Sequence, residues 1–276
     1  MQTSVRLAPF PFLSTEVSRA APKNSFKARL KSGDTQIGLW MGLGDPSVAE
    51  LASGCGFDWM VIDAEHGPNG LRDVLAQLRA VGERSHAVVR TRDDNRAEIK
   101  QMLDIGARTL LVPMIESGAQ AREVVRSVLY PPRGVRGVGA ALARASDYSG
   151  TPDYLHTAND QICLLLQVES TVGLAALDEI LTVEGVDGIF VGPADLAADM
   201  GYLGNPGAPE VQTAVNDALG RIRDAGRAAG ILTSDRTLAA QYEKTGVNFL
   251  AVGSDVGVLR SGLTALRASF GTSASA

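Results

Sequence analysis

The sequence alternates between two kinds of segment, and this alternation constrains the fold more than any other feature. Short apolar runs rich in β-branched residues recur at fairly even spacing, starting at Ile37, Trp59, Ala87, Thr109, Ile162, Gly188, Gly230 and Phe249. Most segments between them carry apolar residues at helical spacing, and several end at a glycine that suits a helix C-terminus. Apolar strands that alternate with amphipathic helices indicate a parallel sheet covered by helices. Eight such units predict an α/β fold of the closed (β/α)8 TIM-barrel type.

An open, doubly wound sheet is the alternative fold. It would normally place a glycine-rich phosphate turn after its first strand, but the first apolar run leads into "MGLGDPS", which contains no such motif. We therefore expect no nucleotide site. The predicted organisation is a single barrel domain over residues 24–270, a disordered N-terminal extension over 1–23 and a loose tail over 271–276.

The chain is mildly acidic, with a net charge of −5 and a pI of about 5.3, which argues against a nucleic-acid or anionic-membrane partner. No apolar run approaches the roughly 18 residues that span a bilayer. Prolines interrupt the apolar patch near the N-terminus too often for a secretory signal. We expect a cytoplasmic enzyme that acts on small molecules. Cys55 and Cys163, far apart and in apolar settings, are expected to be buried thiols in a reducing compartment.

Polar residues follow nearly every predicted strand, at the point where the chain must turn. The second apolar run ends at Asp63, with Glu65 and His66 just beyond it. The other strand exits carry Trp40, Arg90, Glu116, Glu169, Asp195, Ser234 and Asp255. In a barrel the carboxyl ends of the strands meet at one mouth, where reactive groups lie. These residues therefore predict a ring of functional groups around that mouth.

Two of these acids close consecutive strands, so a barrel brings the carboxylates of Glu169 and Asp195 to neighbouring positions. Gln167 shares strand parity with Glu169 and should face the same interior. Two carboxylates with room for water suit Mg²⁺ or Mn²⁺. The competing interpretation is a pair of acids in separate salt bridges. Asp195 could also cap the helix that follows it.

Arg90 and His66 are the remaining candidates for chemistry. An arginine at the strand mouth suits a carboxylate- or enolate-bearing substrate, although it could equally pair with one of the acids. His66 is the best base among the three histidines, and a turn could bring the carboxylate of Asp63 to its imidazole. Glu65 could point into a supporting network, and Asp93 is a plausible cap for the next helix. None of the five lysines closes a predicted strand, so a Schiff-base mechanism is not expected.

Long blocks of the sequence resemble a known family. They include "GLWMGLGDPSVAELASGCGFDWMVIDAEHGPN", "VVRTRDDNRAEIKQMLDIGARTLLVPMIES", "YPPRGVRGVGAALARAS", "LLLQVES", "VEGVDGIFVGPADLAADMGYLGNPGAPEV" and "FLAVGSD". In this order they resemble the metal-dependent class II pyruvate aldolases of the HpcH/HpaI type, in the branch that acts on 4-hydroxy-2-oxoheptanedioate. The resemblance covers residues from about Asn24 to about Phe270.

The resemblance implies a divalent metal (Mg²⁺, Mn²⁺ or Co²⁺) held by Glu169 and Asp195, with pyruvate chelating it. Arg90 would hold the keto or enolate oxygen, and the backbone near Ala194 would hold the pyruvate carboxylate. His66, paired with Asp63, would act as the base through a water on the metal.

Further roles are implied by the same resemblance. Gln167, Trp40 and Leu232 would line the substrate site, and Asp104 and Glu65 would belong to supporting acidic positions, Asp104 near a subunit contact. The assembly would be a homo-hexamer, a dimer of trimers, with the last helices exchanged between neighbours. One departure is Asp147, in "ARASDY", where relatives often carry a basic residue. We expect this loop to border the aldehyde, so Asp147 argues against a dicarboxylate substrate.

The expected reaction is reversible cleavage of a 4-hydroxy-2-oxo acid to pyruvate and an aldehyde such as succinate semialdehyde. A sugar-acid aldolase of the 2-dehydro-3-deoxyglucarate type is one alternative. A second is a lyase for CoA thioesters on the same barrel, but the only basic pocket for a pyrophosphate would come from Arg133, Arg136 and Arg144. A third is a non-catalytic, ligand-sensing barrel, which the filled reactive positions disfavour. The long connection over residues 130–160 is expected to be a functional loop or an oligomer contact.

Overall fold

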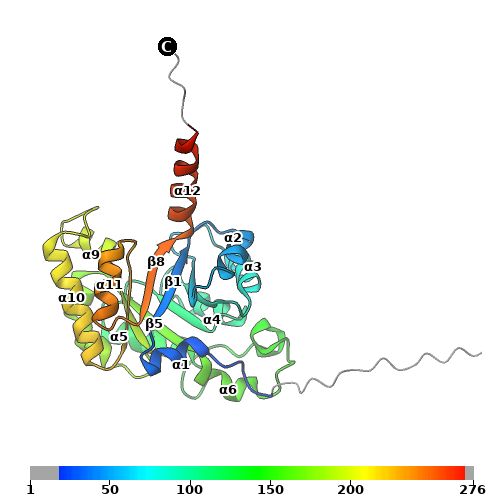
Figure 1. The fold of residues 1–276 in the computed structure, drawn as a ribbon. Coiled ribbons are helices and arrows are strands. Elements are labelled where there is room, and N and C mark those ends of the chain that lie inside the picture. The colour runs from blue at the N-terminus through cyan, green and yellow to red at the C-terminus, as the bar shows by residue number, and fades with distance from the viewer. Residues whose placement is uncertain (1–18, 271–276) are drawn as a thin grey trace, which may run out of the picture.

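Eight parallel strands close into a barrel in the order β1 to β8, which confirms the predicted fold (Figure 1). The computed structural model describes residues 19–270. The strands are β1 (Gln36–Met41), β2 (Trp59–Asp63), β3 (His86–Arg90), β4 (Thr109–Val112), β5 (Cys163–Val168), β6 (Gly188–Val191), β7 (Ala228–Leu232) and β8 (Phe249–Ser254). Each strand lies at one of the eight predicted apolar runs.

Helices surround the barrel. They are α1 (Ser25–Ser32), α2 (Pro46–Ser53), α3 (Leu71–Val81), α4 (Arg96–Asp104), α5 (Gly118–Val128), α6 (Tyr154–Gln161), α7 (Thr171–Ala175), α8 (Leu177–Leu181), α9 (Pro193–Asp199), α10 (Pro209–Asp224), α11 (Arg236–Lys244) and α12 (Asp255–Ser269). Two 3-10 turns, η1 (Ala140–Leu142) and η2 (Arg144–Ser146), lie in the long connection before α6. No helix over residues 19–270 is long and apolar enough to cross a membrane.

Large aromatic side chains fill the barrel interior, and glycines on adjacent strands make room for them. Trp59 pairs in register with Gly38, where a Cβ would lie 2.2 Å from the indole ring. Phe249 pairs with Gly230 in the same way, at 2.0 Å. Any larger residue at these glycines would overlap a buried ring, so the two pairs fix both the filling of the barrel and its register.

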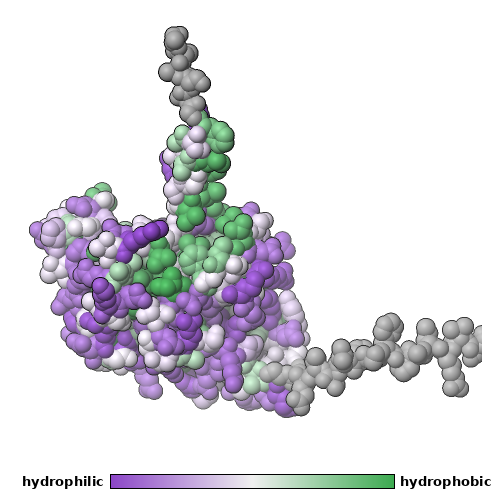
Figure 2. Space-filling model, in the orientation of Figure 1, coloured by the Kyte–Doolittle hydropathy of each residue, from purple (hydrophilic) through white to green (hydrophobic). Residues whose placement is uncertain are grey.

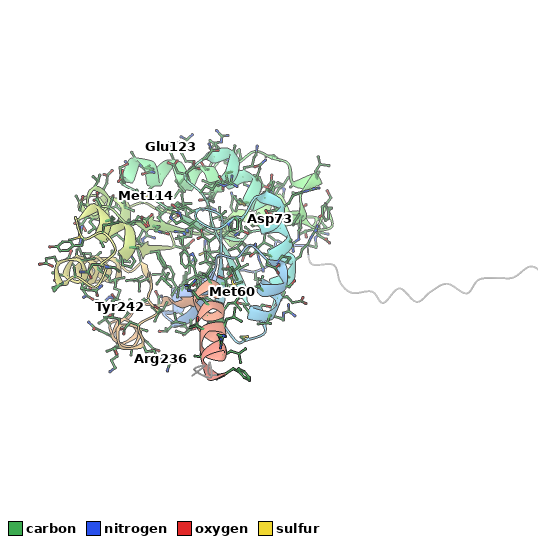
Figure 3. All side chains as sticks on the ribbon, turned by 90° about the horizontal axis from the view of Figure 1, so that it is seen from above. Met60, Asp73, Met114, Glu123, Arg236 and Tyr242 are labelled. Atoms are coloured by element: carbon green, nitrogen blue, oxygen red, sulfur yellow. The ribbon has the colours of Figure 1, made fainter. Side chains whose placement is uncertain are left out.

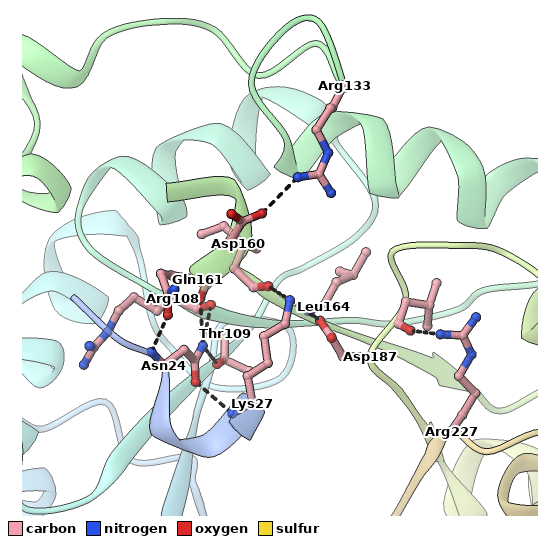
Figure 4. Close-up of polar contacts among 12 residues, drawn as sticks. Asn24, Lys27, Arg108, Thr109, Arg133, Asp160, Gln161, Leu164, Asp187 and Arg227 are labelled. Atoms are coloured by element: carbon pink, nitrogen blue, oxygen red, sulfur yellow. Dashed lines mark hydrogen bonds and ion pairs between the residues drawn. The ribbon is translucent and has the colours of Figure 1, made fainter. Parts of the chain in front are cut away.

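Helix α1 lies at the amino-terminal end of the barrel (Figure 1). The side-chain amide of Asn24 donates to the Thr109 hydroxyl and to backbone carbonyls before β4 and β5 (Figure 4). The Lys27 ammonium lies 3.2 Å from the Asp187 carboxylate, which also accepts from the Leu164 amide at 2.9 Å. These contacts use polar groups to seal that end, so the open mouth for chemistry is the opposite one.

Part of the predicted N-terminal extension has defined contacts. Residues 19–23 lie along α6, where the Arg19 guanidinium pairs with Asp153 at 3.1 Å. The Ala21 amide donates to Thr157 Oγ1 at 2.8 Å, and the Ala21 side chain is buried. Residues 19–23 of the predicted extension therefore pack against α6. Residues 1–18 and 271–276 lie outside the described part of the chain.

Three local expectations are wrong. Cys55 is exposed at the C-terminal end of α2, whereas Cys163 on β5 is buried as predicted. Asn95, not Asp93, caps α4, because its side chain accepts from the amides of Ala97 and Glu98. Helix α9 begins at Pro193 with Gly192 as its N-cap, so Asp195 lies inside the first turn and does not cap it.

Candidate active site

Asp63 and Arg90 form a buried ion pair at the carboxyl ends of β2 and β3. Arg90 Nε and Nη2 donate to the two oxygens of Asp63 at 2.8 and 2.7 Å, and Nη1 lies 2.7 Å from Glu65 Oε2. Trp40, at the end of β1, donates its indole N–H to Asp63 at 3.1 Å and lies beneath the guanidinium, 4.8 Å from ring centroid to Cζ. Burial raises the pKa of Asp63, but the hydrogen bonds and charge of Arg90 outweigh it, so that pKa lies below its usual value.

A second buried carboxylate, Glu169, follows β5 on the same side of the barrel. Its oxygens accept hydrogen bonds from the Gln167 side chain and, at 3.0 Å, from the Met114 amide. Burial raises the pKa of Glu169 to about 7, opposed by these hydrogen bonds and reinforced by the negative charges of Asp195 and Glu65. Burial also raises the pKa of Glu65. The mouth therefore holds more buried negative charge than Arg90 neutralises.

Asp195 and Ala194 lie in the first turn of α9 and are exposed. Asp195 is close enough to both Glu169 and Glu65 for its charge to raise their pKa values. The sequence-based prediction that Glu169 and Asp195 lie together is thus matched by the geometry. The amide of Ala194 belongs to the helix turn whose N–H groups have no partner within the helix.

His66 does not form the predicted contact between its imidazole and Asp63. The Asp63 carboxylate is engaged by Arg90 and Trp40, and it reaches His66 only through the backbone amide at 3.3 Å. The imidazole is largely exposed, and its Nε2 lies 3.9 Å from Glu65 Oε1. Glu65 is therefore the carboxylate that faces the imidazole, because the arginine takes up both oxygens of Asp63.

Two further predicted residues lie apart from this group. Asp104 ends α4 at the amino-terminal end of the barrel, where it pairs with the fully buried Arg136 at 2.7 Å. Leu232, at the end of β7, packs partly against the barrel interior and lines a groove between α11 and α12. Within the described chain, Asp104 makes no contact with the acidic group around Glu169.

Asp255 and Glu116, two other residues at strand exits, hold loops at the mouth. The Asp255 carboxylate accepts from the amides of Gly42 and Leu43 at 2.9 and 3.0 Å, which ties the loop after β1 to the start of α12. Glu116 accepts from the Ser170 hydroxyl at 2.7 Å. Their roles are to position backbone, and neither carboxylate extends the ring of reactive groups.

Sequence reasoning missed three residues that support the site. Met114 has a left-handed backbone (φ 54°) that directs its amide at Glu169, and it lies at the rim of the barrel on the side away from α12 (Figure 3). Gly192 lies against Glu169, since a Cβ there would be 2.3 Å from Oε2. The Asn69 amide donates to the Asp63 carbonyl at 2.6 Å. A glycine directly after a strand was a usable signal for Gly192, but a left-handed methionine leaves no signal in the sequence.

The residues present fit a divalent cation. Among residues 19–270 no group of three or more histidine, cysteine or acidic side chains gathers for a metal, and the candidate donors are the carboxylates of Glu169 and Asp195. The buried Oε1 of Gln167 has no hydrogen-bond partner and adds a neutral oxygen beside them. An all-oxygen set with mutually repelling carboxylates suits a hard cation that keeps several water or substrate ligands.

Comparison with known proteins decides the family. A profile of the HpcH/HpaI aldolase/citrate lyase family matches residues 36–262. The chain belongs to this family. It is 57% identical over 250 residues to a hydroxypyruvate/pyruvate aldolase of Pseudomonas aeruginosa, covering 90% of this chain and 93% of that one. It is 53% identical over 255 residues to a 4-hydroxy-2-oxo-heptane-1,7-dioate aldolase of Shigella sonnei, covering 92% and 97%.

A solved structure agrees with this assignment. The crystal structure of an HpcH/HpaI aldolase/citrate lyase family protein from Burkholderia cenocepacia superposes with a TM-score of 0.86 at 41% identity, covering 90% of this chain and all of that one. As a member of the HpcH/HpaI family, the chain is an aldolase, a carbon–carbon lyase. The earlier alternative of a non-catalytic barrel is therefore excluded.

Proposed function

We propose that this HpcH/HpaI aldolase is a metal-dependent pyruvate aldolase that cleaves 4-hydroxy-2-oxo acids reversibly to pyruvate and an aldehyde. One observation carries the proposal: a buried arginine and a crowded pair of carboxylates share the mouth of the barrel. The arginine supplies fixed positive charge where an enolate oxygen develops, and the carboxylates supply oxygen ligands for a cation.

Arg90 is the group that stabilises the enolate. A guanidinium has five N–H donors; two of them donate to Asp63, and Nη1 also forms an ion pair with Glu65. The remaining donors can bind the keto oxygen of the substrate. Because Asp63 and Trp40 hold the guanidinium on two sides, it does not reorganise as charge develops on that oxygen, which is the condition for strong electrostatic stabilisation.

Glu169 and Asp195 would hold the divalent cation, with Gln167 beside it and the Ala194 amide facing the substrate carboxylate. When bound, the cation would supply Lewis-acid charge to the oxygens of the 2-oxo acid. Without a cation the pKa of Glu169 is about 7. The positive charge of the cation would lower that pKa and keep Glu169 ionised.

Proton transfer is assigned to His66. In cleavage a base takes the proton of the C4 hydroxyl, the C3–C4 bond breaks, the aldehyde leaves and the electron pair remains on the pyruvate enolate, which is then protonated at C3. His66 is exposed at the mouth, and an imidazole nitrogen can accept a proton and later return it. Glu65, which faces its ring, would stabilise the imidazolium; this replaces Asp63 in the role expected from the sequence.

The two kinds of relative favour different substrates. The similarity to the Shigella enzyme favours 4-hydroxy-2-oxo-heptane-1,7-dioate, whose cleavage gives pyruvate and succinate semialdehyde. The similarity to the Pseudomonas enzyme favours hydroxypyruvate in place of, or beside, pyruvate. The expected influence of Asp147 on the aldehyde no longer discriminates, because the structure places Asp147 near the amino-terminal ends of β3, β4 and β5 and not at the mouth.

The CoA-thioester alternative loses its basic pocket. Arg133 pairs with Asp160, Arg136 is buried against Asp104, and Arg144 lies beside Ile105. These three arginines therefore do not gather to hold a pyrophosphate.

Exchange of the pyruvate methyl protons in D₂O, followed by NMR, tests the proposed chemistry without an aldehyde. We expect exchange with Mn²⁺ or Mg²⁺, its loss with EDTA and its return when metal is restored. Arg90→Lys should lose exchange by about 10²-fold or more, by analogy with removal of one oxyanion donor. Exchange that persists in EDTA, or in Arg90→Lys at the wild-type rate, would refute the metal or the arginine assignment respectively.

We also propose a homo-hexamer, a dimer of trimers, in which α12 is exchanged between neighbours. Helix α12 projects from the barrel, and apolar side chains cover it and the surface at its base (Figures 1 and 2). Val258, Leu259, Leu263 and Leu266 are all exposed on it. Beside its first turn runs the groove between α11 and α12, of about 930 Å³, which residues of β8 also line. An isolated chain would leave this apolar surface in water, which favours burial against another copy.

Mass measurement by light scattering, on the intact chain and on one truncated before residue 255, tests the proposed hexamer. A monomeric intact enzyme would contradict it.

A further inference from the structure

A cavity of about 350 Å³ lies on the amino-terminal side of the barrel, away from the catalytic mouth. Its walls come from the segments that precede three neighbouring strands: residues 82–87 before and at the start of β3, residues 106–108 before β4, and residues 161–162 before β5. Helix α3, the turn at residues 144–148, helix α6 and residues 21–22 complete it. Reactive groups of such barrels lie at the other end of the strands, so this cavity is not part of the aldolase site.

Three arginines line the cavity against two acids. Arg79, Arg108 and Arg144 face Glu83 and Asp147, and His86 adds no charge because burial lowers its pKa to about 3. Glu83 is taken up by Arg108, at 3.2 Å. Arg79 and Arg144 make no ion pair within residues 19–270. The cavity thus has an excess of positive charge that the described chain does not neutralise.

The guanidinium of Arg144 is held in a place that disfavours its positive charge. Burial lowers the pKa of Arg144, and the like charges of Arg79 and Arg108 lower it further. Its Nη1 donates to the Ile105 carbonyl at 3.0 Å and packs so closely on Gly106 that a Cβ there would lie 2.4 Å away. Gly106 also has a φ of +102°, which L side chains rarely adopt. Three like charges held around one space are stabilised when an anion enters it.

Part of the cavity lining is apolar. Leu78, Ala107 and Ile162 are buried side chains that face the space. Tyr148 also lines it, on a turn in which residues 147–149 all have left-handed backbone. The volume lies at the small end of the range for small-molecule sites. A ligand that matches both the charged and the apolar lining has an apolar body and an anionic head.

We propose that this cavity is a second ligand site, which binds a small organic anion, a phosphate monoester or a carboxylate, through Arg79 and Arg144. Arg79 contributes charge from the last turn of α3, and Arg144 contributes charge and directional donors from the cavity floor. The head group lies between these two guanidinium groups, and the apolar body lies against Leu78 and Ile162. Occupation stabilises the folded enzyme, because the bound anion relieves the repulsion among the arginines.

Calorimetric titration of the full-length enzyme in EDTA, with phenyl phosphate as the probe, tests the site. Phenylacetate distinguishes a carboxylate head from a phosphate head, and phenol carries no charge. We expect saturable binding of at least one of the two anions, no binding of phenol, and a rise in Tm with that anion. Arg79→Gln and Arg144→Gln should each weaken binding about tenfold or more, since each removes a charge-assisted contact.

Two control variants make the result decisive. Arg122→Gln removes an exposed arginine that pairs with Glu179 elsewhere on the surface, and it should bind like the wild type. Arg90→Ala removes the arginine of the catalytic mouth and, measured well below its own Tm, should also bind like the wild type. Arg79 is exposed and makes no ion pair within residues 19–270, so Arg79→Gln should fold with a Tm no lower than that of the wild type. Equal binding by all variants, loss of binding in Arg90→Ala, or absence of binding by both anions would each overturn the proposal, whatever the outcome of the aldolase tests.

Discussion

Arg90 meets Asp63 through two parallel hydrogen bonds of 2.8 and 2.7 Å, and both side chains are buried. The two residues occupy paired positions on β3 and β2, so the barrel register itself sets this contact. Neither residue is free to move independently. Asp63 therefore positions the arginine. It does not pair with the imidazole of His66, which was the role expected from the sequence.

Asp63→Asn is expected to lower stability and activity together. The amide cannot accept both guanidinium N–H groups, which leaves a buried cation with only Glu65 as a charged partner. Removing one partner of a buried pair costs about 3 kcal/mol. Urea unfolding measures this cost, and pyruvate exchange should fall with it. Asp178→Asn, in an exposed pair with Arg221, is the matched control, with an expected cost below about 1 kcal/mol. Equal costs for the two variants would contradict a structural role for the Asp63–Arg90 pair.

Glu169→Gln should change how stability depends on pH in the absence of metal. The folded chain holds the Glu169 proton up to about pH 7, whereas an ordinary glutamate loses it near pH 4.5. Between these values the folded state binds more protons than the unfolded state, so stability falls as pH rises. Below pH 4.5 this residue makes no such contribution, and above pH 7 the loss is complete. We expect the Tm of Glu169→Gln to exceed that of the wild type at pH 8 in EDTA, with the difference vanishing near pH 4.5.

Metal should reverse that pH dependence in the wild type. A cation bound to ionised Glu169 favours the charged form, so Mn²⁺ should raise the Tm more at pH 8 than at pH 5. Glu169→Gln should lose most of this increase at pH 8. An increase of equal size in the variant would show that the cation binds elsewhere.

The regular parts of this fold were predictable from sequence because they follow from local periodicity. The eight strands follow from the apolar runs of the sequence. The proximity of Glu169 and Asp195 follows from their positions after two consecutive strands of a barrel. Side-chain pairing at the mouth was not predictable in the same way. Asp63 lies three residues from His66 along the chain, yet it binds Arg90, because the register of β2 and β3 places a guanidinium directly beside it. Sequence distance does not carry that information.

Met114→Val is expected to disturb Glu169 from outside the strand. The left-handed backbone of Met114 (φ 54°) aims its amide at Glu169, and a β-branched residue adopts this conformation poorly. Loss of that hydrogen bond removes one contact that lowers the pKa of Glu169, so the pKa should rise further. Metal affinity at neutral pH should fall, as measured by Mn²⁺ titration. Met114→Gly keeps the amide and permits the backbone, and it should retain the wild-type affinity; a similar loss in both variants would point instead to the methionine side chain.

Gly230→Ala should destabilise the barrel through its interior. The new Cβ would lie 2.0 Å from the ring of Phe249, which is fully buried and packs against Trp59 and Phe190. The ring cannot move aside without displacing these neighbours, so we expect a cost of about 3 kcal/mol, at the upper end for overpacking. Gly253→Ala on β8 is the matched control, because a Cβ there meets nothing within 4 Å. Guanidinium chloride unfolding compares the two variants. Should Gly230→Ala unfold at the same midpoint as Gly253→Ala, the glycine–aromatic pairs would not fix the barrel interior as described.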